Sequence, residues 1–230
     1  MAISINDRLT KAISFIDNCG TLADIGSDHG YSSIYAIQKG IAKKVIATDI
    51  SKPSLAKTEK LVNEYDLSNC IECRAGDGMK VLASGEVDAA LIAGMGAELI
   101  AQIIRDSHQI ASAIPQLILQ PMNSAQPLRR ALSEMGYGIT HEGIVVDNDK
   151  FYQIIKCSYG NPKPLSDDEA ELGTFVYNER IPLCKEYVEH IIRKQEKIME
   201  YIGNNDEDKL RETAGKIERY RRVLEWINAR

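Results

Sequence analysis

Short apolar runs alternate with amphipathic segments through the first two thirds of the chain. Most of these runs are bounded by glycine, proline or aspartate, which is typical of strands that are buried on both faces of a sheet. The segments between the runs place apolar residues three and four positions apart, as amphipathic helices do. This alternation predicts an α/β fold with a mostly parallel, doubly wound sheet.

The same pattern locates the individual elements. The expected strands are residues 21–26, 43–50, 70–78, 87–96 and 115–121, followed by two closing strands within 137–159. The expected helices are residues 5–18, with Asn6 as N-cap, 31–40, 52–66, 97–110 and 124–136. A tight turn, DNDK, joins the closing strands, so the pair should add one antiparallel strand to the sheet.

The pattern becomes entirely helical after a turn-rich linker, Asn161 to Pro164. Ser166 and Glu169 fit a capping box at the start of the first helix that follows. We therefore expect two domains, an α/β domain at residues 1–160 and a helical domain at residues 161–230.

The helical domain is expected to be an antiparallel hairpin. One arm has a heptad-like seam of Leu210, Thr213, Ile217, Tyr220, Leu224 and Ile227, and the other a rougher seam of Tyr187, Ile191, Lys194, Ile198 and Tyr201. Gly203 and its neighbours supply the turn, and Pro182 either kinks or restarts the first arm. Because two arms of one chain can cover each other, we expect a monomer, with a dimer left open.

Composition narrows the class of protein. With 230 residues, 44% hydrophobic and 27% charged, the chain is typical of a soluble globular protein. Asp7 and Arg8 interrupt the region where a signal peptide would be apolar, and no membrane span is expected. The five cysteines are scattered, so we expect reduced thiols, a cytoplasmic protein and no metal site. The net charge of −5 argues mildly against a nucleic-acid partner, unless basic residues gather locally.

Candidate chemistry lies in the turns at the carboxyl ends of the five parallel strands, where doubly wound folds bind ligands. These turns hold Asp24, Gly26, Asp28 and Gly30; Asp49 and Ile50; Gly76, Asp77 and Gly78; Ala93, Gly94 and Met95; and Gln120 with Pro121.

The first turn does not suit a phosphate. Its glycines are spaced GxxxG, not GxGxxG, and Asp28 lies between them. A carboxylate there would repel a pyrophosphate and attract a cation. S-adenosylmethionine carries an ammonium and a sulfonium and no phosphate, so it is the expected cofactor. Gly26 and Gly30 would allow the backbone to approach it closely.

The next turns supply hydrogen-bond acceptors for the hydroxyl and amino groups of a ligand. Asp49 follows Gly26 by about the spacing at which an acidic residue meets ribose hydroxyls, and Asp77 is placed to accept from an adenine amino group. Each aspartate alone is more often an N-cap or a turn residue. Their joint order favours a cofactor site of Asp24, Gly26, Gly30, Asp49, Ile50, Gly76, Asp77, Gly78, Ala93, Gly94 and Met95.

Several motifs together resemble one family. DIGSDHGY, ATDIS, AGDG, IAGMGAELI, LILQP and KFYQII are similar to motifs of the bacterial tRNA (adenine-N1)-methyltransferases that modify adenine twenty-two. The resemblance covers essentially the whole chain. It implies a Rossmann-like class I methyltransferase domain, a C-terminal coiled-coil domain, and methyl transfer from S-adenosylmethionine to N1 of a tRNA adenine.

The chain departs from the family pattern at three motifs. Ala97 replaces the last glycine of GMGG, and Met122 replaces the asparagine of QPN, with Asn123 next in the chain. DHGYSS stands where the family usually has DHAYLP. Whether these changes weaken activity is left open by the sequence.

The expected reaction limits the catalytic roles. Adenine N1 carries a lone pair, so the enzyme mainly needs to position it and to provide a negative field. Asp28 is the candidate for that field or for accepting the N6 proton, unless it only binds the cofactor ammonium or caps the next helix. His29 is either a base or a packing residue. Tyr31 and Met95 either line the pocket of a flipped base or pack in the core.

A tRNA substrate also needs cations that grip its backbone. The candidates are Arg8, Arg129 and Arg130 near the catalytic face, and Arg193, Lys194, Lys197, Lys216, Arg219 and Arg222 on the hairpin. Interleaved glutamates leave open a merely salt-bridged helix surface. Two other functions also stay open, a methyltransferase for a small molecule or protein and an NAD-binding Rossmann protein.

Overall fold

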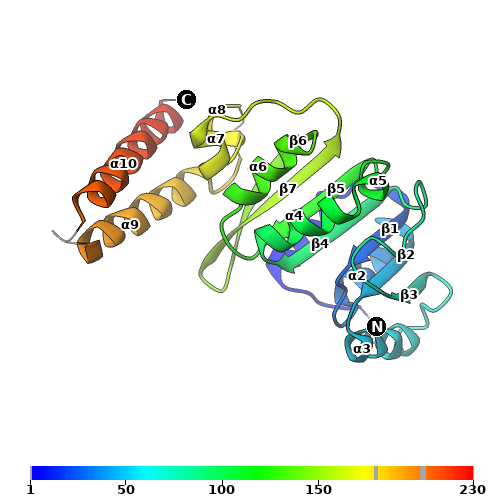
Figure 1. Ribbon diagram of the computed structural model, residues 1–230. Coiled ribbons are helices and arrows are strands. Elements are labelled where there is room, and N and C mark those ends of the chain that lie inside the picture. The colour runs from blue at the N-terminus through cyan, green and yellow to red at the C-terminus, as the bar shows by residue number, and fades with distance from the viewer. Residues whose placement is uncertain (1, 179–180, 203–205, 230) are drawn as a thin grey trace. The chain divides into compact units, whose positions relative to one another are not determined.

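A seven-stranded sheet organises the N-terminal part of the computed structural model, which describes residues 2–178, 181–202 and 206–229 (Figure 1). The strand order is β3-β2-β1-β4-β5-β7-β6. The strands are β1 (Cys19–Ile25), β2 (Ala42–Asp49), β3 (Ile71–Ala75), β4 (Ala89–Met95), β5 (Gln116–Pro121), β6 (Tyr137–Asp147) and β7 (Lys150–Tyr159). Strands β1 to β5 pair in parallel, and β7 pairs antiparallel with both β5 and β6. The predicted sheet with one antiparallel strand is confirmed.

Helices cover both faces of this sheet. They are α1 (Asp7–Ile13), α2 (Tyr31–Gln38), α3 (Lys52–Glu64), α4 (Ala97–Asp106), α5 (His108–Ala111) and α6 (Gln126–Glu134). The side chain of Asn6 accepts the Leu9 amide and so begins α1, as predicted. The helix expected at 97–110 is instead two helices, because the backbone at Ser107 leaves the helical region.

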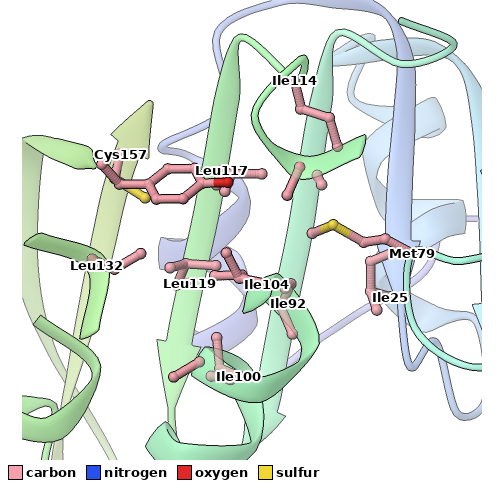
Figure 2. Close-up of a cluster of buried hydrophobic side chains, with 14 of the residues drawn as sticks. Ile25, Met79, Ile92, Ile100, Ile104, Ile114, Leu117, Leu119, Leu132 and Cys157 are labelled. Carbon is pink, nitrogen blue, oxygen red and sulfur yellow. The ribbon is translucent and has the colours of Figure 1, made fainter. Parts of the chain in front are cut away.

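Alternate residues of the strands build two hydrophobic clusters. Ala23, Ile25 and Ile92 belong to the cluster under α4 and α6, part of which is drawn in Figure 2. Leu22 and Leu91, their neighbours in sequence, belong to the cluster under α1, α2 and α3. Since successive strand residues point to opposite faces, continuous apolar runs are what a sheet covered on both sides requires.

The C-terminal unit comprises residues 165–230, and the N-terminal unit ends at Pro164. The predicted boundary after residue 160 therefore falls at the start of the linker, which belongs to the first unit. The helices of the second unit are α7 (Asp167–Leu172), α8 (Phe175–Asn178), α9 (Cys184–Ile202) and α10 (Glu207–Asn228). The capping box of Ser166 and Glu169 is confirmed. Pro182 precedes α9, so it does not kink that arm, and the turn predicted at Gly203 lies outside the described residues.

Helices α9 and α10 lie side by side, but the predicted seams are only partly correct. On α10, Thr213, Ile217 and Tyr220 are buried as expected. On α9 the seam is wrong beyond Ile191, because Lys194 and Tyr201 are exposed while Val188 and Ile192 are buried. Within the described residues, no helix has the length and apolar character that crossing a membrane would demand.

A buried ion pair joins α6 to the edge strand β6. Arg129 Nε donates to Glu142 Oε1 at 2.7 Å, and both side chains are almost completely inaccessible to solvent. The prediction that Arg129 contacts RNA is therefore wrong, since its guanidinium lies inside the protein. The neighbouring Arg130 is exposed.

This pair predicts an asymmetric response to mutation. Arg129→Met should lower the free energy of unfolding by about 3–5 kcal/mol, because it leaves the Glu142 carboxylate buried without its main partner. The double variant Arg129→Met with Glu142→Leu should recover most of that loss. Urea denaturation measures both, with Arg130→Met as the control on the same helix. A loss in Arg129→Met as small as that in Arg130→Met would contradict the assignment.

Candidate active site

A cavity of about 530 Å³ opens at the carboxyl ends of β1, β2 and β4. Of the predicted site residues it is lined by Arg8, Asp24, Gly26, Asp28, Tyr31, Asp49, Ile50, Asp77, Gly78, Ala93, Gly94 and Met95. Four turns that are far apart in the sequence thus meet around one space. Gly30 and Gly76 were also predicted for the site but lie outside this lining.

The two outlying glycines have a packing reason instead. A Cβ at Gly30 would lie 2.6 Å from Thr58 Cγ2, and a Cβ at Gly76 would lie 2.0 Å from Val81 Cγ1. Gly30 also has a φ of +75° and begins α2 as its N-cap. These glycines let helix and turn pack closely, which is a different role from approach to a ligand.

Gly26 does face the cavity. Its φ is +73°, and a Cβ there would lie 2.1 Å from Met95 Cε. The turns after β1 and β4 therefore touch at this point. Met95 lines the cavity and also packs against the hydrophobic cluster under α4. Its core packing is therefore observed, and its place beside a target base stays a prediction.

Asp24 lies at the floor of the cavity and is buried. Its Oδ2 accepts hydrogen bonds of 2.6 Å from the hydroxyls of Ser32 and Ser33, both on α2. Burial raises the pKa of the Asp24 carboxyl, and the serine hydrogen bonds oppose that rise. The serines were missed from the sequence. The only sign of them was that small hydroxyl residues follow the glycine turn.

Asp28 lies at the rim of the cavity. Its backbone has a φ of +50°, its N–H donates to Asp49 Oδ2 at 3.1 Å, and its carbonyl accepts from the Thr58 hydroxyl at 2.8 Å. The side chain is 69% exposed, with Oδ2 3.6 Å from Nε2 of His29. The turn is therefore fixed through its backbone while the carboxylate is left facing solvent.

The other two aspartates differ in their surroundings. Asp49 accepts from the backbone N–H groups of both Asp28 and Ser51, the latter at 2.7 Å, so its carboxylate is oriented by two turns. Asp77 Oδ2 lies 2.5 Å from Nζ of the exposed Lys80. Both carboxylates line the same cavity and are acceptors for hydroxyl or amino donors.

Arg8, which was predicted to contact RNA near the catalytic face, lines the cavity. Its guanidinium donates to the side-chain oxygen of the buried Gln120, which also accepts the Gly94 amide at 3.0 Å. The guanidinium lies 5.7 Å from the centroid of the Tyr152 ring. Burial lowers the pKa of Arg8. Gln120 thus joins α1 to the end of β4, a role that its place at a strand end did not reveal.

The structure shows a role for Asn123, the residue after the Met122 that replaces the asparagine of the family's QPN motif. Asn123 Oδ1 accepts the backbone N–H of Ala97 at 2.8 Å, at the first turn of α4. Met122 is exposed. The asparagine that follows Met122 therefore accepts a hydrogen bond from the first residue of α4, which is the alanine of GMGA.

The predicted RNA contacts on the helical unit fall into two groups. On α10, Lys216 pairs with Glu212, Arg222 pairs with Glu218, and the partly buried Arg219 lies 2.6 Å from Glu171. On α9, Lys194 and Lys197 are exposed, and no ion pair joins either one to another described residue. The nine predicted cations are therefore not equivalent.

The comparisons with known proteins agree with this geometry. A family model described as a methyltransferase domain matches residues 5–155. The chain belongs to this methyltransferase family. The methyltransferase is 28% identical over 233 residues to the tRNA (adenine(22)-N(1))-methyltransferase of Bacillus subtilis (strain 168), covering 97% of this chain and 98% of that one.

Two solved structures resemble the methyltransferase over nearly its whole length. One is a Streptococcus pneumoniae protein in complex with S-adenosyl-L-methionine, at 29% identity and a TM-score of 0.85, covering 96% of this chain and 100% of that one. The other is M. capricolum TrmK in complex with S-adenosyl-homocysteine, at 26% identity and a TM-score of 0.80, covering 97% and 99%. The resemblance drawn from the motifs is confirmed.

Burial of Asp24 predicts a pH dependence of stability. The unfolded carboxyl ionises near its ordinary pKa of 3.8, and the folded one ionises only at higher pH. Between these two values the folded state retains a proton that the unfolded state has lost, so stability falls as pH rises. Asp24→Asn keeps an acceptor oxygen for the serines and should abolish that fall. Urea denaturation from about pH 4 to pH 8 measures the difference from wild type; parallel curves for the two proteins would contradict it.

Proposed function

We propose that this methyltransferase transfers a methyl group from S-adenosylmethionine to N1 of an adenine in tRNA. The observation that carries the proposal is the cavity at the strand ends, into which three turns bring aspartates and which has no glycine motif for a pyrophosphate. A carboxylate-rich cavity suits a ligand with a positive tail and ribose hydroxyls. The tRNA substrate is supported by similarity to the Bacillus subtilis enzyme over both units of the chain.

The residues around the cavity fit the parts of the cofactor. We assign Asp49 to the ribose hydroxyls, the exposed Ile50 to the adenine face, and Asp77 to the adenine amino group. Gly26, Gly78, Ala93 and Gly94 give these turns the small size that close approach requires. Asp24, which is buried below the first turn, shapes the floor through Ser32 and Ser33.

The chemistry asks little of the protein beyond placement. When bound, S-adenosylmethionine would supply a sulfonium methyl group: the lone pair of adenine N1 would form the new N–C bond while the S–C bond breaks and S-adenosylhomocysteine leaves. The methylated base is cationic and then loses a proton from N6. Asp28, exposed at the rim, provides a negative field for that charge and an acceptor for that proton. Tyr31 and Leu99, both exposed and both lining the cavity, provide apolar surface for an extruded base.

A methyl-transfer assay tests the proposal. Purified protein is incubated with labelled S-adenosylmethionine and unmodified bulk tRNA, and the tRNA is then digested for nucleoside analysis. The proposal predicts label in N1-methyladenosine. Absence of label in tRNA from a protein that still binds the cofactor would contradict the substrate, and would favour a small-molecule or protein acceptor.

Asp49→Ala tests the cofactor assignment. Loss of a charge-assisted acceptor should weaken binding of S-adenosylhomocysteine by about ten- to a hundredfold. Isothermal calorimetry measures the affinity, and Glu64→Ala, an exposed carboxylate on α3, is the control. Equal affinities for Asp49→Ala and the control would defeat the ribose assignment.

Asp28→Asn separates catalysis from cofactor binding. Asparagine tolerates the positive φ and keeps the backbone hydrogen bonds, so only the charge is removed. We expect kcat to fall on the order of 10²-fold with little change in affinity for S-adenosylhomocysteine. The reverse result, weak cofactor binding with an unchanged kcat at saturation, would instead place Asp28 at the cofactor ammonium.

A further inference from the structure

Two lines of polar residues run along the surface of α9. One side has His190, Lys194, Lys197 and Tyr201, at intervals of four, three and four residues. Such intervals place residues above one another along a single line of a helix. Glu189, Glu196 and Glu200 lie along a different line of the same helix. Glu189, Glu196 and Glu200 therefore lie apart from Lys194 and Lys197, although Arg193 shares the line of the glutamates and Glu186 lies four residues before His190.

Two of these three glutamates are in ion pairs. Glu196 Oε1 lies 2.8 Å from the guanidinium of Arg221 on α10, and Glu189 lies 3.9 Å from Arg193 on its own helix. In the described part of the chain, Lys194 and Lys197 have no such partner. The cations of α10 that were predicted to bind RNA are paired with carboxylates. Among the described residues of the hairpin that were predicted to bind RNA, Lys194 and Lys197 are thus the two cations without an ion pair.

The surroundings of His190 support this grouping. Burial lowers the pKa of His190, and the nearby charges of Arg193, Lys194 and Lys197 lower it further. The three cations are therefore close enough to act together on one imidazole. A cluster of like charges raises the electrostatic energy of the isolated protein, and an anion relieves it.

An exposed aromatic side chain ends the stripe. Tyr201 is 91% exposed, and Ile198 beside it is 38% exposed. The positions from 190 to 201 span about 16 Å along the helix. Cations followed by an exposed ring match the two requirements of nucleic-acid contact, namely neutralisation of phosphates and stacking on an unpaired base.

We infer that this α9 stripe, defined as His190, Lys194, Lys197 and Tyr201, is the surface by which the helical unit holds tRNA. Lys194 and Lys197 contact backbone phosphates, and the Tyr201 ring stacks on an exposed base. The inference rests on the proposed function and adds to it which side of the hairpin faces the RNA. With a net charge of −5, the chain can bind RNA only through such a local concentration of cations.

Two double variants of equal charge test the stripe. Lys194→Gln with Lys197→Gln removes two stripe cations, and Lys216→Gln with Arg222→Gln removes two cations that are already paired on α10. The α9 variant should weaken tRNA binding on the order of tenfold at moderate salt. The dependence of log K on log salt should also become shallower by about 0.7 to 0.9 for each phosphate that is no longer neutralised. The α10 variant should stay near wild type in both measurements.

Tyr201 is tested separately. Tyr201→Phe keeps the ring and should retain affinity, whereas Tyr201→Leu should weaken tRNA binding without changing the salt slope. Circular dichroism and S-adenosylhomocysteine affinity, expected to be unchanged in all variants, verify that the fold and the cavity are intact.

Each other outcome overturns the inference in a recognisable way. If the α9 and α10 variants bind tRNA equally while methylation of tRNA persists, the stripe is wrong and the proposed function stands. If wild-type protein neither binds nor methylates tRNA, the proposed function fails and the stripe with it. If polyglutamate displaces tRNA from wild type as well as polyadenylate of equal charge does, the surface fits an acidic protein rather than RNA.

Discussion

The end of β2 fixes the turns on both of its sides, and the cavity depends on this arrangement. The carbonyl of Thr48 accepts the backbone N–H groups of Gly26 and Ser27, each at 2.9 Å. The carbonyl of Asp49 accepts the backbone N–H of Gly76 at 3.0 Å. The carboxylate of Asp49 accepts the backbone N–H of Asp28. The turns after β1 and β3 are thereby tied to one dipeptide. Asp28 and Asp77 are held at one cavity although the chain separates them widely.

Much of the fold could be predicted because burial on both faces gives a strand an apolar sequence whatever its partners are. The antiparallel β7 followed from one tight turn. The fate of Arg129 could not be predicted, since it and Arg130 are adjacent in sequence. Their difference depends on Glu142, which reaches Arg129 only after β6 has joined the sheet.

The candidate site shows the same limit. Aspartates and glycines at strand ends could be found from the sequence, because parallel strands bring their carboxyl ends to one edge. The reason for an individual glycine could not, since Gly30 is required by Thr58 and Gly76 by Val81, both on later segments. The α9 seam failed for a related reason. Several spacings of three and four fit its sequence, and only packing against α10 decides which side is buried.

The two units have different expected roles. The sheet unit builds a cavity whose carboxylates suit a cationic nucleoside, and the helical unit places the exposed Lys194 and Lys197 along one line of α9. Neither property follows from net charge, which is negative for the whole chain. Both follow from side chains that the fold brings together, with buried groups such as Asp24 and Gln120 holding the surrounding elements in place.

Carboxylates in the strand-end turns should make this cavity select S-adenosylmethionine over a dinucleotide. Isothermal calorimetry of the wild-type protein with S-adenosylmethionine and, separately, with NAD measures this selectivity. We expect saturable one-site binding of S-adenosylmethionine and no detectable binding of NAD, whose pyrophosphate would meet Asp28. Binding of NAD with equal or higher affinity would contradict the role given to these carboxylates.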